Sequence, residues 1–252
     1  MKKPSVSVVI PTYYNPTTIK KTLISIKSQI LQPKEIIIID NSPDKKSQKT
    51  IFDLKKKLNL NIKYFSKRVN PDQSRNFAVG KSKSKWIAFI DDDDEWKKNY
   101  LSYNFSKIDY YNLDFTYTNM NIINEYNKKI SYVNLPHEID LKSLFVFNHG
   151  FFCSNLILKK SCFDSVKGFD TRAGSADKDL ALKLSEKKYE YQIIKKFLVD
   201  KRASDVQWSK NYKLMLRNNI NFFIKYKSEV SIFLKLLLVK KIIKLAILSK
   251  LN

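Results

Sequence analysis

The chain has little glycine, cysteine and histidine, and each shortage removes a class of site. Only 4 of its 252 residues are glycine, and no glycine-rich phosphate loop of the GxGxxG or GxxxxGK type occurs. Cys153 and Cys162, the two cysteines, lie in apolar surroundings, which favours packing in a reducing compartment over a disulfide framework. His137 and His149, the two histidines, are too far apart for a local metal motif. A nucleotide or metal site must therefore use other residues.

Long apolar runs are also missing. No segment reaches the roughly 18 uninterrupted apolar residues expected of a membrane-spanning helix. The run from Val6 to Ile10 is shorter than the apolar region of a usual export signal, and Pro11 ends it without a small-residue cleavage site. We therefore expect this run to be a buried first strand, and the protein to be cytoplasmic or peripheral to a membrane.

Acidic residues are few, with 24 Asp and Glu against 47 Lys and Arg, a formal net charge of +23. A basic protein can bind polyanions through non-specific phosphate contacts. However, only 5 of the 47 basic residues are arginine, whose fork suits bases and phosphates, and no nucleic-acid motif occurs. We expect no nucleic-acid partner, and keep a polyanion-binding or nucleic-acid-binding module as an alternative. The 43% hydrophobic residues predict a folded chain with a sizeable core.

Against this basic background, the stretch "FIDDDDEW" gathers five carboxylates from Asp91 to Glu95. Neighbouring carboxylates resist ionisation unless a positive charge lies among them. A helix cap would need only one of them. The cluster therefore indicates a site for a cation or a polar ligand.

Apolar runs alternate with segments of helical length along the first half of the chain. The runs 5–10, 35–40, 61–65 and 85–90 are rich in β-branched and aromatic residues, and the helices are expected at 17–29, 46–57 and 73–81. This order predicts an α/β fold with a doubly wound, mostly parallel sheet flanked by helices, whose ligands lie beyond the carboxyl ends of the strands. Asp40 and Asp91 each end such a run, so they should face the same crevice.

The second half of the chain is less regular. Strands or a hairpin are expected in "LDFTYTNMNIINEY", a helix near 141–147 and a strand near 151–158. We predict one globular domain over 1–205, made of an N-terminal half at 1–96 and a C-terminal half at 97–205, followed by basic amphipathic helices at 206–252.

Four segments in order carry a resemblance to a known family: "VSVVIPTYYNP", "IIIIDNSPD", "RNFAVGKSKSKWIAFIDDDDEW" and "VKGFDTRAGSADKDLALKL". Together, from about Val6 to about Ile194, they resemble the family 2 glycosyltransferases, inverting nucleotide-sugar enzymes of the GT-A fold. The resemblance implies a nucleotide diphosphate-sugar donor in the N-terminal half, a divalent metal on its diphosphate, and an acceptor in the C-terminal half.

The resemblance also implies roles for the carboxylates. Asp93 would bind the metal directly, while Asp91 and Asp92 would contact the ribose or the waters of the metal. The metal would be Mn²⁺ or Mg²⁺, since each binds a diphosphate with one or two carboxylates and polarises the leaving group as a Lewis acid. Asp40 would bind the nucleobase.

Further donor contacts are implied at Pro11 and Thr12, which would line the base, and at Arg75, which would face the nucleotide. A salt bridge from Arg75 to one of the aspartates is an alternative compatible with that role. Many relatives carry a histidine after the base region; here none occurs between Phe197 and Trp208, and Arg202 is a candidate substitute on the diphosphate.

Asp177 occupies the position of the family's catalytic base, which would take the proton of the acceptor hydroxyl. Ala176 stands where the family usually has glutamate, which leaves that acceptor contact in question. From the residues alone, Asp177 would be read as a helix cap.

The segment from Lys201 to Asn252 holds 12 Lys and Arg against 2 Asp and Glu, a net charge of +10. Apolar residues and interspersed lysines are typical of a helix that lies on an anionic membrane surface. The alternative is a helix packed on the catalytic domain or on another subunit, so an oligomer remains open.

These observations lead to one hypothesis. The protein would be a metal-dependent inverting glycosyltransferase on the cytosolic face of a membrane, using a nucleotide sugar, UDP-sugars favoured, and a glycan or lipid-linked acceptor in cell-surface polysaccharide biosynthesis. A catalytically silent relative is the second alternative.

Overall fold

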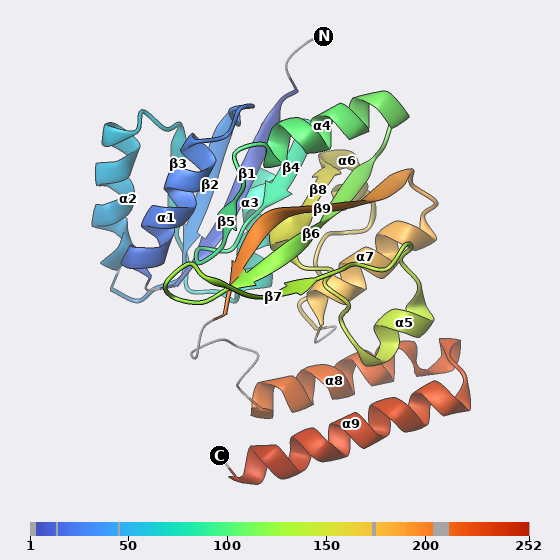
Figure 1. Cartoon of the computed structure of the whole chain (residues 1–252). Coiled ribbons are helices and arrows are strands. Elements are labelled where there is room, and N and C mark those ends of the chain that lie inside the picture. The colour runs from blue at the N-terminus through green and yellow to red at the C-terminus, as the bar shows by residue number, and fades with distance from the viewer. Residues whose placement is uncertain (1–3, 14, 45, 173–174, 204–211, 252) are drawn as a thin grey trace.

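One nine-stranded sheet runs through the computed structural model, which describes residues 4–13, 15–44, 46–172, 175–203 and 212–251 (Figure 1). The strand order is β3-β2-β1-β4-β8-β6-β9-β5, and β7 pairs with β6. The strands are β1 (Val6–Thr12), β2 (Glu35–Asp40), β3 (Ile62–Ser66), β4 (Trp86–Phe89), β5 (Glu95–Trp96), β6 (Phe115–Ile123), β7 (Lys129–Val133), β8 (Leu156–Lys159) and β9 (Tyr191–Arg202).

The N-terminal half of this sheet is parallel, as the four apolar runs predict. β1 pairs in parallel with β2 and β4, and β2 pairs with β3. Successive side chains enter opposite cores: Val8 and Ile10 pack on one face, while Val9 packs on the other. Because both faces are covered, every residue of β1 and β2 is buried and most are apolar.

Helices cover both faces of the sheet, which confirms the predicted fold class. α1 (Pro16–Lys27), α2 (Lys46–Lys57) and α4 (Tyr100–Tyr111) pack on one face. α3 (Pro71–Lys81), α5 (Leu141–Val146), α6 (Lys160–Ser165) and α7 (Ala176–Glu186) pack on the other. α3 begins with a capping box, in which the Asn70 side chain accepts from the N–H of Gln73, and Pro71 fits the first turn.

The C-terminal half of the sheet is mixed. β8, after the short 3₁₀ helix η1 (Cys153–Asn155), runs antiparallel to β4 and β6. β9 is parallel to β6 over most of its length, and its far end pairs antiparallel with β5. β9 thereby connects the core of the sheet to the loop that carries the carboxylates.

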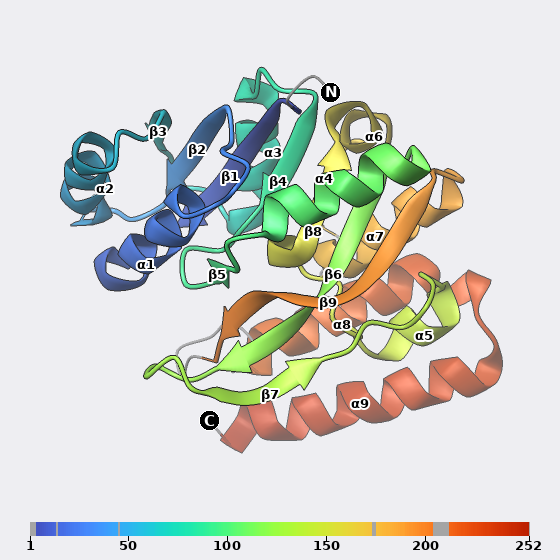
Figure 2. The same ribbon diagram turned by 45° about the horizontal axis from the view of Figure 1, so that its top comes forward.

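Two further helices, α8 (Tyr212–Tyr226) and α9 (Ile232–Leu251), lie side by side below the sheet in Figures 1 and 2, joined through the 3₁₀ helix η3 (Lys227–Glu229). Phe222 and Leu238 are fully buried in the core formed with α5 and α7. None of the described helices is long and apolar enough to cross a membrane. The predicted domain boundary at 205 and 206 lies outside the described residues.

Candidate active site

The carboxylate loop, Asp91 to Glu95, follows β4 at the carboxyl end of the parallel strands. It is fixed to β1, because Thr12 donates its hydroxyl hydrogen to Asp92 at 2.5 Å and the Tyr13 N–H donates to the same oxygen at 3.2 Å. The backbone N–H of Asp91 donates to the Ser154 hydroxyl at 3.0 Å. The first and fourth predicted strands thus converge on this loop.

Arg202, at the end of β9, holds the loop from the other side. Its backbone N–H donates to Asp94 at 3.0 Å, and its guanidinium donates to the Asp93 carbonyl and forms a 2.6 Å ion pair with Glu95. The residue is only 5% exposed. These bonds give Arg202 a supporting position, and they show that Asp94 receives a strand N–H rather than capping a helix.

Asp93 differs from its neighbours, because its carboxyl accepts no hydrogen bond from any described residue. Burial, and then the charge of Asp94, raise the pKa of Asp93 to about 8, although Lys201 acts in the opposite direction. The Lys201 ammonium lies 3.9 Å from Asp94. The loop therefore gathers more carboxyl groups than the nearby cations keep ionised.

Arg75, on α3, joins this loop to the next part of the site. Its two terminal nitrogens bind Asp72 at 2.9 Å and Asp91 at 2.6 Å. Burial alone would raise the pKa of Asp91, but the charge and hydrogen bond of Arg75, together with the charge of Lys201, hold that pKa below its usual range. The salt bridge expected as an alternative for Arg75 is thus present.

Asn76, the residue after Arg75 on α3, fixes a turn that precedes α7. Its amide donates to the Phe169 carbonyl at 2.8 Å and accepts from the Phe169 N–H at 2.9 Å. Gly168, just before, has φ +61°, and a Cβ there would lie 2.6 Å from both the Asn76 oxygen and the Phe163 ring. The "VKGFD" turn is therefore fixed against α3, and it leads into α7.

Asp177 lies in the first turn of α7. One carboxylate oxygen accepts a hydrogen bond from the Cys153 thiol at 2.8 Å. Burial raises the pKa of Asp177 to about 6, and the nearby Arg75 charge limits the rise. The helix cap is Ser175, and among the described contacts Asp177 makes no capping bond. Its environment resembles that of a general base more than that of a cap.

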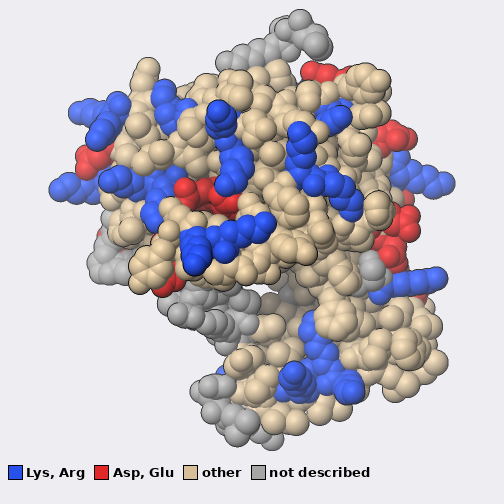
Figure 3. Space-filling view, in the orientation of Figure 1, with Lys and Arg blue, Asp and Glu red and all other residues tan. Residues whose placement is uncertain are grey.

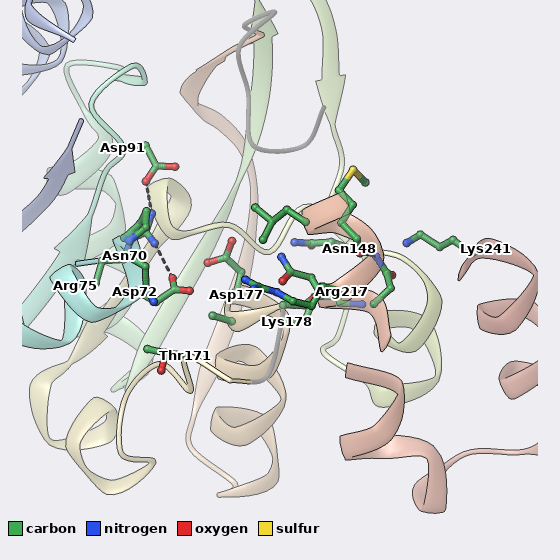
Figure 4. A pocket seen from close by; sticks show the side chains of 17 residues that line it. Asn70, Asp72, Arg75, Asp91, Asn148, Thr171, Asp177, Lys178, Arg217 and Lys241 are labelled. Atoms are coloured by element: carbon green, nitrogen blue, oxygen red, sulfur yellow. Dashed lines mark hydrogen bonds and ion pairs between the residues drawn. The ribbon is translucent and has the colours of Figure 1, made fainter. Parts of the chain in front are cut away.

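Arg75, Asp91 and Asp177 line one pocket of about 470 Å³. Figure 4 shows Asp91, Arg75 and Asp72 on one side, Asp177 in the middle, and Arg217 and Lys241 on the side formed by α8 and α9. Residues from the predicted donor half, the acceptor half and the tail therefore meet around Asp177.

The other predicted donor residues do not line this pocket. Pro11, Thr12 and Asp92 lie where β1 approaches the loop. Asp40 is fully buried at the end of β2, where it accepts from Ser42 at 2.6 Å and from the Tyr64 hydroxyl at 2.8 Å. Asp40 and Asp91 end strands on either side of β1, so both lie at the same edge of the sheet.

A divalent metal fits the loop on the chemistry of its donors. Within the described residues, no group of three or more His, Cys, Asp or Glu side chains forms a closed metal site. A Mg²⁺ or Mn²⁺ ion shared with a diphosphate needs only one or two carboxylates, since phosphate oxygens and water complete its shell. Asp93, without a hydrogen-bond donor and surrounded by negative charge, is suited to be such a ligand.

Three parts of the site are not evident from sequence patterns. Cys153 binds Asp177, Asn76 fixes the turn before α7, and α8 forms a pocket wall. The first two join segments 24 and 93 residues apart, and no local spacing encodes such pairs. For α8, the only signal is an apolar face, which does not identify what it packs against.

Comparisons with known proteins agree with this arrangement. The sequence model of Glycosyl transferase family 2 matches residues 7–166. An uncharacterized glycosyltransferase of Rickettsia bellii is 33% identical over 139 residues, which are 53% of this chain and 19% of that protein. The Escherichia coli protein WfgD, a UDP-Glc:alpha-D-GlcNAc-diphosphoundecaprenol beta-1,3-glucosyltransferase, is 28% identical over 158 residues, covering 62% of this chain and 60% of WfgD.

Solved structures share the fold at low sequence identity. Mannosyltransferase PcManGT from Pyrobaculum calidifontis, in complex with GDP-Man and Mn²⁺, superposes with a TM-score of 0.69 at 14% identity, covering 92% of this chain and 66% of that one. S. aureus TarS 1-349 in complex with UDP-GlcNAc gives a TM-score of 0.65 at 16% identity, covering 96% and 81%. At these identities the likeness concerns the fold.

Proposed function

The chain belongs to glycosyl transferase family 2, and we propose that it transfers a sugar, with inversion, from a nucleotide diphosphate-sugar to a glycan or lipid-linked acceptor in cell-surface polysaccharide biosynthesis. One observation carries the proposal: Asp177 lies in the same pocket as Asp91 and Arg75. A base for the acceptor hydroxyl would thereby lie next to the loop that would hold the donor.

On the donor side, Asp40, Pro11 and Thr12 would bind the nucleobase, Arg75 would face the nucleotide, and Asp91 and Asp92 would contact the ribose or the waters of the metal. Their position at the carboxyl ends of parallel strands supports this role. A UDP-sugar is favoured, in keeping with the donor in the name of WfgD.

Asp93, with Asp91, would hold Mn²⁺ or Mg²⁺ on the diphosphate. When bound, the metal supplies charge neutralisation of the leaving nucleoside diphosphate. The crowding of carboxyl groups in the loop, which disfavours their ionisation without a further cation, supports this assignment.

Asp177 would act as the general base. With a pKa of about 6, it is mostly ionised at neutral pH and can accept the proton of the acceptor hydroxyl as that oxygen attacks the anomeric carbon. The bond between the sugar and the diphosphate breaks on the opposite face, which gives inversion. The ion pairs of Arg75 with Asp72 and Asp91 offset negative charge on the α3 side of the pocket.

α9 supports a location on the cytosolic face of a membrane. Large apolar side chains on it are exposed, among them Ile232 at 70%, Phe233 at 65% and Leu236 at 61%. Exposed Lys240 and Lys244 accompany them. Such a combination suits an interfacial helix on anionic lipid.

Asp177→Asn tests the proposal. UDP-sugars and GDP-sugars are offered with Mn²⁺ to prenyl diphosphate-linked and free oligosaccharide acceptors, and nucleotide release is measured. The variant should keep donor affinity and lose transfer by roughly 10²–10⁴-fold. Glu186→Gln, on the exposed end of the same helix, is the control and should transfer normally.

Undiminished transfer by folded Asp177→Asn protein would reject the base assignment. Donor binding without transfer by the unmodified protein, with any acceptor, would identify a catalytically silent relative instead.

A further inference from the structure

α8 forms a wall of the pocket that contains Asp177. Leu214, Met215, Arg217, Asn218 and Asn219 all line it, and α9 adds Lys241 (Figure 4). These residues follow the segment matched by the family model, which ends at residue 166. The wall is therefore built by the C-terminal helices, beyond the segment that the family model matches.

The wall is fixed to the helix that carries Asp177. The Tyr226 hydroxyl donates to Asp179 at 2.7 Å, and Lys225 pairs with the same carboxylate and with Asp170. Lys241 donates to the Val146 carbonyl at 2.7 Å. Because Asp179 is two residues from Asp177, α8 keeps a set position relative to the candidate base.

The charges of the two sides of this pocket are unequal. On the α3 side, the Arg75 guanidinium is paired with Asp72 and Asp91. On the other side, Arg217 makes no hydrogen bond or ion pair with any described residue and is exposed. It therefore presents an unpaired guanidinium fork at the pocket.

Two lysines add to this positive side. Lys178 donates to the Leu144 carbonyl at 2.9 Å and lies 3.9 Å from the centre of the Phe222 ring, and no carboxylate among the described residues pairs with it or with Lys241. Burial, together with the charge of Lys241, lowers the pKa of Lys178 to about 7. The cluster of Arg217, Lys178 and Lys241 thus lacks a counter-ion.

We infer that this cluster binds a phosphate group of the acceptor, so that the acceptor is a sugar linked through phosphate to a lipid. The inference rests on the proposed transfer at Asp177 and specifies its second substrate. A planar guanidinium binds phosphate oxygens with two parallel hydrogen bonds, which suits Arg217. The acceptor hydroxyl would then lie toward Asp177, on the other side of the phosphate-linked sugar.

The lipid is assigned by apolar side chains next to Arg217. Leu214 and Met215 line the pocket beside it. Ile220 and Ile224, three and seven residues further along α8, share its face of the helix and are 36% and 58% exposed. A lipid chain attached to the bound phosphate would lie along these apolar side chains. A sugar-phosphate polymer would find few polar partners there.

The test is calorimetric titration with geranyl diphosphate, in the presence of saturating UDP and Mn²⁺ to fill the donor site. Arg217→Ala should weaken binding by about tenfold or more, as expected for a charge-assisted, two-pronged contact. Lys240→Ala is the control, since this exposed lysine lies beside Lys241 but does not line the pocket; it should leave affinity within about twofold.

Inorganic pyrophosphate and geraniol separate the contributions of the phosphates and the lipid. Both should bind more weakly than geranyl diphosphate. Equal affinity for pyrophosphate would overturn the lipid assignment, and equal binding by folded Arg217→Ala protein would overturn the phosphate site. Failure of UDP to bind would instead contradict the proposed donor, while the comparison of Arg217→Ala with Lys240→Ala would still decide the inference.

Discussion

Cys153 contributes to the ionisation of Asp177, the proposed general base, alongside the larger effects of burial and of the Arg75 charge. Its buried thiol donates to Asp177 and thereby favours the ionised carboxylate. Cys153→Ala removes this donor, so the pKa of Asp177 should rise by roughly 0.5–1 unit. Proton acceptance requires the ionised carboxylate, so the pH below which the transfer rate falls should rise from about 6 by the same amount.

Cys153→Ser is the matched control, because a hydroxyl also donates a hydrogen bond. It should restore the pH below which the transfer rate falls to its original value or a lower one. If Cys153→Ala instead lowers the transfer rate by the same factor at every pH, Cys153 has a packing role alone.

Asp93 is the residue at which metal binding should be visible as proton release. With a pKa of about 8, its carboxyl is largely protonated at pH 7, and a divalent ion must displace that proton. Titration of the protein with Mn²⁺ and UDP in buffers of different ionisation enthalpy should therefore show proton release at pH 7. Asp93→Asn should release less and bind Mn²⁺ with UDP about tenfold more weakly.

Asp53→Asn, at an exposed position on α2, controls for the change of charge. Proton release that is unchanged in Asp93→Asn would assign the metal to another carboxylate.

At the scale of elements, Asp179 is the anchor of α8. The carboxylate is fully buried and accepts from the Tyr226 hydroxyl at 2.7 Å. Tyr226→Phe leaves part of a buried carboxylate without its donor, so the free energy of unfolding should fall by roughly 1–3 kcal/mol in urea denaturation. Tyr110→Phe, on a side chain that is 79% exposed, should change it little.

If Tyr226→Phe is as stable as the unmodified protein, α8 is held by its apolar face alone. The position of α8 beside the pocket would then depend on the packing of Phe222 and its neighbours in the core.

The strands could be predicted from sequence more completely than the site. The runs at 35–40 and 85–90 are mostly apolar and contain the whole of β2 and β4, whose residues are all buried, so their composition alone identifies both strands. By contrast, β5 has two residues, and only its pairing with β9 defines it. The contact between Cys153 and Asp177 likewise depends on how β8 and α7 pack, which no periodicity within either segment specifies.

The residues to which the family resemblance gives roles also fall into two groups. The structure brings Arg75, Asp91 and Asp177 into one pocket, whereas Asp40, Pro11, Thr12, Asp92 and Asp93 remain predicted donor and metal residues around the strand ends. For 206–252, helices were expected, and α8 and α9 are present. That α8 lines the pocket could not be predicted, because an apolar face specifies burial but not the partner that provides it.

At the scale of the whole molecule, positive charge and apolar surface occur together on the C-terminal helices. Figure 3 shows basic side chains over much of one face, including the region of α8 and α9, and only small acidic areas. Phe233 and Leu236 on α9 are more than 60% exposed. We predict that the protein co-sediments with vesicles rich in anionic lipid, and that salt weakens the binding.

Phe233→Glu with Leu236→Glu should reduce vesicle binding by about tenfold or more, because each change removes apolar area and adds negative charge. Ile30→Glu with Phe52→Glu, at exposed apolar positions on the N-terminal half, is the matched control. An equal loss of vesicle binding in both double variants would mean that the change of charge alone causes it. If the unmodified protein forms a defined oligomer and does not bind vesicles, α9 packs on another subunit.

The hold of Arg202 on the carboxylate loop has a consequence for how the protein folds. Its contacts with Asp93, Asp94 and Glu95 span 107 to 109 residues of chain. Contacts of such separation form only after the intervening segments have been brought together, and they slow folding relative to local structure. During refolding, helices and the first parallel strands should therefore return before nucleotide binding does, with the carboxylate loop among the last parts of the molecule to reach its working shape.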